Sequence, residues 1–314
     1  MLEQSSSSIG SGKTSRDYDK RKEGVTLTVF DVDELVSIPR AYVQQRDLLR
    51  CVGPDTNEFL QGQLSQDVKT LSDASSSWSF LLNPNGKVCV WLRVSRISED
   101  EYILDMEQGW GRLALERLNR FKIRIKCEIE LSQVEAIRIL GKGSKKLKED
   151  SKEKGEINAD AGWPNLEGYD LIDPTATPPS ICENGTKEEY EYLRISNAIP
   201  SMGAEITEGI IPAETNLVSR SVSFTKGCYT GQELVARLDS RGNKVAKNLC
   251  KLTSPGSFSS GSNIYSEGRE VGVVTSSVSS EAGTIGLGYL SRSFSIPGAA
   301  EIDGVLVQID SASD

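Results

Sequence analysis

The chain has 314 residues, with 36 Lys and Arg against 45 Asp and Glu, a formal net charge of −9, 37% hydrophobic and 26% charged residues. At roughly 150 residues per domain this length predicts two or three domains with a sizeable core, and the composition indicates an acidic, soluble, globular protein. Histidine is absent. This excludes catalytic triads with histidine, histidine metal ligands and imidazole pH switches, so any chemistry has to use Cys, Asp, Glu, Lys or backbone amides.

The sequence gives no sign of membrane insertion or export. Its longest apolar runs, at 78–82 and 88–94, are far shorter than the roughly 18 to 20 residues of a membrane span. The N-terminal 24 residues lack an apolar segment and mix acids with bases, which fits neither a secretory signal nor a transit peptide. We therefore expect a cytoplasmic protein.

The cysteines are scattered, with no C-x-x-C pair, which argues against a disulfide framework, a zinc ribbon or a cluster-binding run. We expect separate reduced thiols. They are Cys51, Cys89, Cys127, Cys182, Cys228 and Cys250.

The first 140 residues predict mixed strands and helices. Residues 1–24 are Ser-, Gly- and Lys-rich and are expected to be a disordered tail. Two strand-like runs follow, and then Asp55 and Glu58 have capping-box spacing for a helix with apolar side chains recurring as far as Leu71. The predicted strands in this stretch are 25–31, 47–52, 78–82, 88–94, 101–106 and a pair over 123–140, with a second helix over 108–122. Strict alternation of strand and helix is missing, so an α+β fold is favoured over a doubly wound sheet.

The rest of the chain predicts a helix over 187–199 and then short strands. The Lys-rich run 142–154 mixes both signs of charge and is interpreted as a solvated surface. From residue 245, short apolar runs alternate with Gly, Ser and Pro turns, which is typical of a small β-barrel or sandwich. We expect a tail over 1–24, a main region over 25–244 with an insert near 142–160, and a β-domain over 245–314.

One stretch, 224–237, combines glycines, a lysine and a cysteine. Thr230 and Glu233 have capping-box spacing, which predicts a helix starting at Gly231. Cys228 would lie just outside its positive end, where the helix dipole and Lys226 favour a thiolate. The alternative is a small buried cysteine beside glycines that merely form a turn.

The string Lys226-Gly227-Cys228-Tyr229-Thr230-Gly231-Gln232-Glu233 resembles the signature of the YgfZ family of folate-binding proteins, relatives of the glycine-cleavage T-protein aminomethyltransferase (GcvT). Further segments resemble the same family in the same order. They are Asn57 to Val68 (NEFLQGQLSQDV), Asn83 to Lys87 (NPNGK), Ile211 to Asn216 (IPAETN), Val271 to Ser276 (VGVVTS) and Gly286 to Leu290 (GLGYL). The resemblance covers about residues 40 to 308.

This resemblance implies an α+β fold in three parts, two α+β lobes around a folate cavity and a C-terminal β-barrel. It also implies binding of tetrahydrofolate, or another folate, and a role in the assembly or repair of iron-sulfur clusters. The partners it implies are client enzymes, among them enzymes that modify tRNA, or assembly factors. We expect a monomer that contacts neither a membrane nor, given its net charge, RNA directly.

The transferase branch of the family carries paired acids after the N-terminal hairpin, whereas this chain has Val90 and Trp91 there. We therefore expect folate binding without aminomethyl transfer. Two alternatives stay open. The first is a folate-dependent aminomethyl or methyl transferase that uses a substitute acid such as Asp67 or Asp105. The second is a thiol redox protein that uses Cys228.

A folate has a flat pterin, an aryl spacer and an anionic tail, so its site needs aromatic or aliphatic walls, a carboxylate or amide, and a cation near the mouth. The aromatic candidates can equally be plain core, and the charged ones can be solvated or ion-paired at the surface. The candidate catalytic residue is Cys228, and no metal ligand is proposed. The candidate folate-binding residues are Trp78, Trp91, Glu205, Glu214, Lys226, Gly227, Tyr229, Gly231, Gln232, Glu233 and Arg237.

Overall fold

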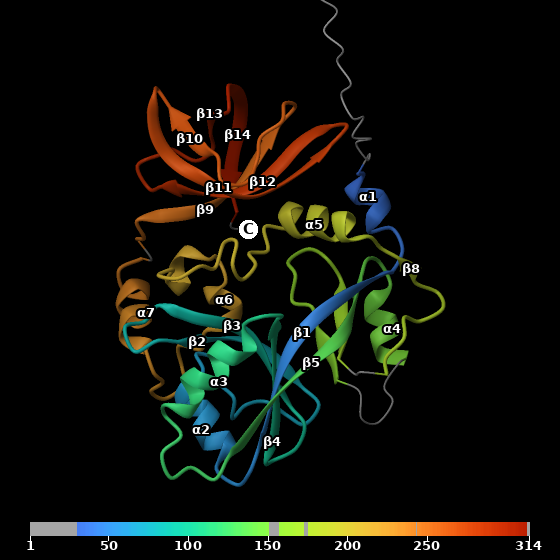
Figure 1. Cartoon of the computed structure of the whole chain (residues 1–314), viewed down its shortest axis with the longest axis vertical. Helices are drawn as coiled ribbons and strands as arrows, with labels where there is room; N and C mark the ends of the chain where they lie inside the picture. The colour runs from blue at the N-terminus through green and yellow to red at the C-terminus, as the bar shows by residue number, and fades with distance from the viewer. Residues whose placement is uncertain (1–29, 151–156, 173–174, 243, 313–314) are drawn as a thin grey trace, which may run out of the picture.

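The computed structural model describes residues 30–150, 157–172, 175–242 and 244–312. It has an eight-stranded sheet with short helices packed around it, and a separate closed β-barrel near the C-terminus (Figure 1). Helix α5, Lys187–Ser196, lies between the barrel and the sheet. The predicted α+β class with a C-terminal barrel is confirmed. The predicted disordered tail over 1–24 lies outside the described residues.

The large sheet is built around two long strands that cross the molecule side by side (Figure 1). Strands β1 and β5 each have 13 residues and pair antiparallel along their whole length. Three strands add to one side of this pair and two to the other, in the order β2-β3-β4-β1-β5-β7-β6, while β8 pairs with the start of β1. The bounds are Arg40–Val52 (β1), Ser76–Leu82 (β2), Val88–Arg96 (β3), Glu101–Glu107 (β4), Glu128–Leu140 (β5), Ile157–Asp160 (β6), Gly168–Ile172 (β7) and Glu183–Asn184 (β8).

The helices of this part are short. Helix α2 covers Thr56–Gln63, although the apolar spacing predicted a helix as far as Leu71. It ends there because Leu64 is extended and forms a bridge with Leu81 of the hairpin. The other helical bounds are Val32–Leu35 (α1), Gly111–Asn119 (α3), Ser144–Asp150 (α4), Pro212–Glu214 (a 3-10 turn), Val218–Ser221 (α6) and Gln232–Asp239 (α7).

Several predicted elements differ from the structure. The strand pair predicted over 123–140 is the single strand β5, because its apolar residues pair with one long partner, β1, and need no turn. Of the predicted strand 25–31, only the last two residues are described, and Asp31 caps helix α1 instead. Asp55 makes no capping-box bond, since its carboxylate accepts the Lys126 amide at 2.7 Å. The predicted hairpin of β2 and β3 is confirmed.

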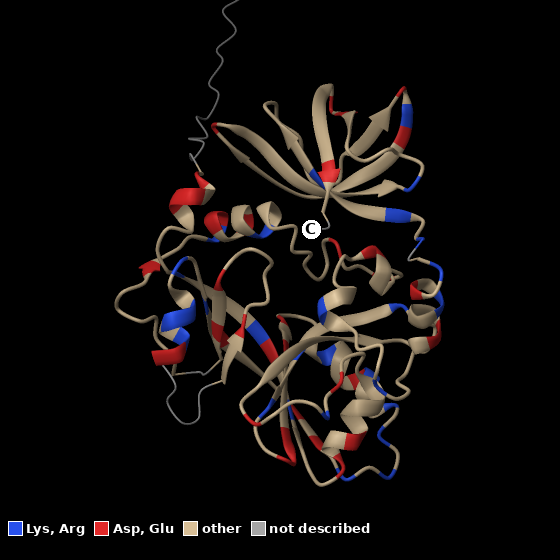
Figure 2. Ribbon diagram, turned by 180° about the vertical axis from the view of Figure 1, so that it is seen from behind, with Lys and Arg blue, Asp and Glu red and all other residues tan. Residues whose placement is uncertain are grey.

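The C-terminal strands close into a barrel in the order β10-β11-β12-β9-β14-β13. Its interior is a separate apolar cluster that includes Cys250, Ile264, Ile302 and Ile309. Seen from behind, Lys and Arg are interspersed with Asp and Glu over the sheet and the barrel (Figure 2). The strand bounds are Lys247–Ser254 (β9), Asn263–Ser266 (β10), Arg269–Ser280 (β11), Gly283–Ser291 (β12), Gly298–Ile302 (β13) and Val305–Ser311 (β14).

Among the described residues, each helix is too short or too polar to span a bilayer. The division of the chain at residue 245 stays a prediction.

Candidate functional site

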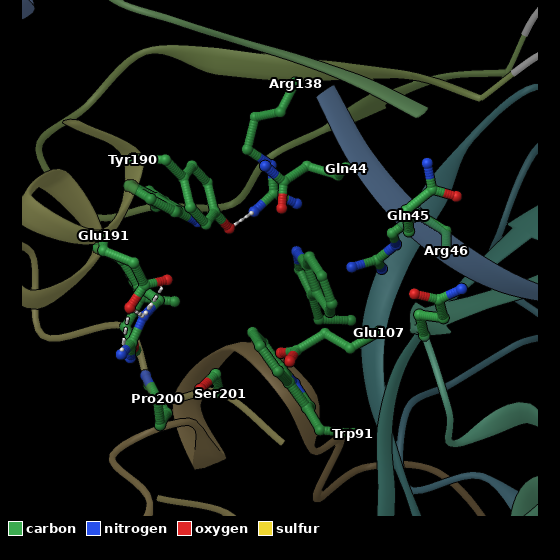
Figure 3. Close-up of a pocket in the computed structure, with 15 residues that line it drawn as sticks. Gln44, Gln45, Arg46, Trp91, Glu107, Arg138, Tyr190, Glu191, Pro200 and Ser201 are labelled. Atoms are coloured by element: carbon green, nitrogen blue, oxygen red, sulfur yellow. Dashed lines mark hydrogen bonds and ion pairs between the residues drawn. The ribbon is translucent and has the colours of Figure 1, made fainter. Parts of the chain in front are cut away.

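A cavity of about 270 Å³ lies where the central strands of the sheet meet helix α5 (Figure 3). Each of strands β1 to β5 contributes at least one side chain to its wall, and α5 with the turn after it closes the other side. The lining residues are Gln44, Gln45, Arg46, Trp78, Trp91, Glu107, Gln108, Arg138, Trp163, Tyr190, Glu191, Arg194, Ile199, Pro200 and Ser201.

Two tryptophans form an aromatic wall of the cavity. The rings of Trp78 on β2 and Trp91 on β3 stack at 4.1 Å between centroids, with 19° between their planes. The indole N–H of Trp78 donates a hydrogen bond to the carbonyl oxygen of Ala161 at 3.2 Å, and the indole N–H of Trp91 donates one to Ser221 Oγ at 3.0 Å. Both tryptophans predicted as candidate site residues therefore lie at one cavity, held rigidly.

A chain of buried ion pairs forms the floor behind the cavity. Arg46 pairs with Asp105, and Arg93 donates to Asp105 at 2.9 Å and to Asp170 at 2.7 Å. Arg138 donates to both carboxylate oxygens of Asp170, at 2.7 and 2.8 Å. Although burial alone would raise the pKa of both carboxyls, the neighbouring arginines hold each below its usual range.

This network fixes the arginines that face the cavity. Arg138 also donates to the Tyr190 hydroxyl at 2.9 Å (Figure 3). Because Asp105 is fully buried and already paired, it is not free to transfer protons to a ligand, as one alternative from the sequence required. The other substitute acid, Asp67, accepts from Gln61 and from the Lys69 amide and is not among the residues that line the cavity.

Glu107, at the end of β4, is the carboxyl group at the cavity without a strong cationic partner. It accepts the Met202 amide at 3.2 Å, and Figure 3 shows it beside Trp91. Burial raises its pKa, and the opposing effect of the Arg46 charge is smaller. Glu107 can therefore hold a proton at a pH where an ordinary glutamate has lost it.

Helix α5 supplies the opposite wall through Arg194. This arginine pairs with Glu191 at 2.9 Å and with Glu205 at 3.1 Å. Glu205 is fully buried and also accepts hydrogen bonds from Thr275 and Ser276 of barrel strand β11, at 2.7 and 2.6 Å. The predicted ligand Glu205 therefore joins α5 to the barrel and lies behind the cavity wall.

Glu214 also has a local structural partner. It lies in the 3-10 turn and accepts the Ile211 amide at 3.4 Å, and burial raises its pKa. It is not among the residues that line the cavity.

An outer chamber of about 490 Å³ adjoins the first. The two share Gln44, Gln45, Gln108, Tyr190 and Glu191. The outer one adds the exposed Lys187 at the start of α5, together with the backbone turn before it. A ligand longer than the inner cavity can thus extend past α5 to a cation at the surface.

Residues 224–231, which precede helix α7 and are called the cysteine loop below, form a second candidate region. Lys226 inserts its ammonium among three backbone carbonyls, those of Gln61, Leu64 and Gln66, at 2.7 to 2.8 Å. Burial lowers its pKa to about 8. Lys226 therefore anchors the loop to helix α2 and the residues after it, while Cys228 is exposed to solvent.

The start of helix α7 differs from the capping box predicted for it. The N-cap is Gly231, at a φ of +85°, and the Thr230 hydroxyl lies near Gly62 and Gln63 instead of capping the Glu233 amide. A Cβ on Gly231 would come within 2.6 Å of Asn83 O and 2.9 Å of Leu82 Cβ. Gly231 is therefore required for the loop to pack on the hairpin.

The other candidate residues between 227 and 237 differ in their exposure to solvent. Tyr229 is buried, which raises its pKa to about 12, and its amide donates to Gln232 Oε1 at 3.2 Å. Glu233 and Arg237 are exposed on α7, and Gly227 has open space around it. None of the described residues 226–237 is among those that line the cavity.

The structure thus brings Trp78 and Trp91 together and leaves the cysteine loop apart from them. Sequence reasoning missed Arg46, Glu107, Arg138, Tyr190 and Arg194. For Arg138 a signal was available, a charged residue inside the apolar run Ala136 to Leu140, since such a residue is buried only when it is paired.

Comparisons with known proteins find relatives that are 27 to 28% identical to this chain. No model of a known protein family matches the chain. An uncharacterised protein of Haemophilus influenzae is 27% identical over 74% of this chain and 82% of its own length, and the tRNA-modifying protein YgfZ of Vibrio atlanticus is 27% identical over 71% and 72%. A mitochondrial iron-sulfur cluster assembly factor IBA57 homolog of Cryptococcus neoformans is 28% identical over 64% of this chain and 63% of its own length.

A solved structure has the same fold. The glycine cleavage system aminomethyltransferase T of Bartonella henselae superposes with a TM-score of 0.73, covering 88% of this chain and 87% of that one, at 18% sequence identity.

Proposed function

The chain belongs to the YgfZ/GcvT-like family, and we propose that it is a tetrahydrofolate-binding accessory protein for the assembly or repair of iron-sulfur clusters. The names of the relatives, an iron-sulfur cluster assembly factor and a tRNA-modifying protein, support this role. Under this proposal the protein acts in the cytoplasm as a monomer and supports tRNA-modifying and other cluster enzymes indirectly.

The observation that carries the proposal is the composition of the cavity. A flat pterin needs a stacking surface and a carboxyl for its N–H edge, and the rigid tryptophan pair lies beside Glu107. The anionic glutamyl tail of a folate needs a polar channel and a cation, and the outer chamber leads to Lys187. These residues fit a folate, with Arg46 and Arg138 held in place by their carboxylate partners.

Cys228 would serve a different step. It is exposed and lies outside the cavity lining, so it can meet another protein. Iron-sulfur clusters usually take about four thiolates, and no group of three potential metal ligands occurs among the described residues. We therefore assign Cys228 to contact with a client enzyme or assembly factor, where any cluster ligation is shared between the two proteins.

Direct RNA binding is not part of the proposal. The net charge is −9, and Lys and Arg alternate with acids along the ribbon in the view of Figure 2. Such a surface binds phosphate backbones weakly at physiological salt. A filter-binding assay with tRNA should detect no tight complex, and a tight, salt-sensitive complex would contradict this part of the proposal.

The test of folate binding is an anaerobic calorimetric titration with tetrahydrofolate. We expect saturable one-to-one binding, weakened at least tenfold by Glu107→Gln because the amide replaces one of the two carboxyl oxygens that face the pterin N–H edge with an NH2 donor. Glu101→Gln is the matched control, since Glu101 lies at the opposite end of the same strand. No heat at near-millimolar ligand, or equal binding by the two variants, would overturn the assignment of the cavity.

Aminomethyl transfer is a second candidate, and Glu107 is the observation that favours it. Val90 and Trp91 leave strand β3 without the transferase acids, yet Glu107 brings a carboxyl of raised pKa to the same cavity. A carboxyl of this kind can exchange a proton with a bound folate. Turnover of a methyl or aminomethyl donor with tetrahydrofolate, lost in Glu107→Gln, would establish transfer, whereas binding without turnover supports the accessory role.

A further inference from the structure

Two cysteines far apart in the sequence lie together at one end of the long strand pair. Cys51 is the penultimate residue of β1, and Cys127 directly precedes β5. In the ladder, Val52 pairs with Glu128, so the register brings the two cysteines close to each other. A Cβ on Gly53 would lie 3.2 Å from the Cα of Cys127, which shows how tightly the two chain segments approach.

In the ladder Cys51 pairs with Ile129, so Cys127, two residues before Ile129, lies on the same side of the strand pair as Cys51. The neighbouring Cys51 thiol lowers the pKa of Cys127 to about 6, against the effect of burial. The Cys127 group, followed by burial, raises the pKa of Cys51 well above its usual range. A lowered pKa on Cys127 beside a raised pKa on Cys51 favours a thiolate next to a thiol, the combination in which one sulfur is nucleophilic and the other carries a proton.

The remaining cysteines have different surroundings. Cys89 and Cys250 are buried and Cys182 is partly buried, and burial raises the pKa of each. Cys228 is exposed, in a loop apart from the strand ends.

We propose that Cys51 and Cys127 form a dithiol that a small peroxide oxidises to a disulfide. Both side chains are nearly inaccessible, so the oxidant has to be small, and hydrogen peroxide meets this requirement. This site is distinct from the folate cavity and does not depend on the proposed function.

The reaction balances in two steps. The Cys127 thiolate attacks one oxygen of hydrogen peroxide, the O–O bond breaks, and the departing hydroxide takes up a proton to become water, which leaves a sulfenic acid on Cys127. Cys51 then attacks the Cys127 sulfur, the S–O bond breaks, and the sulfenic hydroxyl leaves as hydroxide and takes up the Cys51 proton to become water. The two cysteines lose two electrons and the peroxide gains them. The new bond joins the end of β1 to the start of β5.

The test uses the full-length native protein. After reduction and desalting, it is treated with hydrogen peroxide, its free thiols are alkylated, and its peptides are mapped by mass spectrometry without reduction. We expect one cross-linked peptide containing Cys51 and Cys127, while Cys89 and Cys250 stay alkylatable after unfolding. Absence of this peptide when the exposed Cys228 is already oxidised, or its formation only in unfolded protein, would overturn the proposal.

Single serine variants distinguish the cysteine that reacts with peroxide, Cys127, from the one that resolves the sulfenic acid, Cys51. In Cys51→Ser the sulfenic acid on Cys127 has no resolving thiol, so dimedone added on unfolding, after the peroxide has been removed, should label Cys127 at least tenfold more than in the wild-type protein. In Cys127→Ser dimedone should not label Cys51. Labelling of Cys51 instead, or equal labelling of both, would contradict the assignment even if one variant is unstable, since the wild-type cross-link provides an independent readout.

Discussion

The cavity and the cysteine loop show two ways of building a site. The cavity takes side chains from every strand between β1 and β5 and from α5, and its charges neutralise one another in a buried network. The cysteine loop is one continuous stretch, and a single buried lysine anchors it by three hydrogen bonds while Cys228 stays exposed. Under the proposed function, the cavity would hold a small ligand between side chains fixed by this network, and the loop would present one thiol to a large partner.

The largest effect is expected from breaking the network behind the cavity. Asp170→Ala leaves Arg93 and Arg138 buried without their shared carboxylate, which should lower the free energy of unfolding by about 3 to 5 kcal/mol. Urea unfolding measures this. The control Asp160→Ala, which removes the exposed partner of Lys148 on the neighbouring strand, should cost less than about 1 kcal/mol. Similar losses in both variants would mean that the network is not what stabilises this region.

The anchor of the loop comes next. Lys226→Met removes three charge-assisted hydrogen bonds and leaves the carbonyls of Gln61, Leu64 and Gln66 without this donor. We expect a loss of about 2 to 3 kcal/mol, and faster hydrogen exchange confined to the loop and the end of α2. Lys87→Met, at an exposed position, is the matched control. Uniformly faster exchange over the whole sheet would contradict a local anchor.

A smaller effect, dependent on pH, is expected from Glu107. Because its folded pKa lies above the unfolded value, Glu107 takes up a proton on folding, and its contribution to stability falls as pH rises from about 4.5 to the raised pKa. Glu107→Gln removes this slope, so the variant should gain stability relative to wild type across that range and keep a constant advantage above it. Thermal unfolding from pH 4 to 8 measures the difference. A difference independent of pH would show that Glu107 titrates normally.

The smallest effect on stability is expected at Cys228. Since the side chain is exposed, Cys228→Ser should change the free energy of unfolding by less than about 0.5 kcal/mol and leave tetrahydrofolate binding intact. It should nevertheless lower the cluster content of client enzymes in cells that rely on this protein. Unchanged client activity together with intact folate binding would show that the Cys228 thiol is not needed for the proposed function.

Much of the fold could be predicted from short stretches of sequence. The hairpin around Asn83-Pro84-Asn85-Gly86 and the helix at 187 form because turn and capping residues act on neighbours a few residues away. The capping box predicted at Thr230 was wrong because the loop packs on the hairpin, which turns that hydroxyl toward helix α2. The spacing of residues permits a capping hydrogen bond, but tertiary packing determines whether that bond forms.

The candidate site divides in the same way. The sequence by itself determined the α+β class, the barrel and the cysteine string, because periodicity, turn residues and a continuous motif are local properties. Only the tertiary structure decided that Arg46, Glu107 and Arg138 line one cavity, and that Glu205 holds the barrel to α5. Charges can be buried in an apolar sheet only with partners supplied by distant strands. Which partners meet is fixed by the register of β1 against β4 and β5.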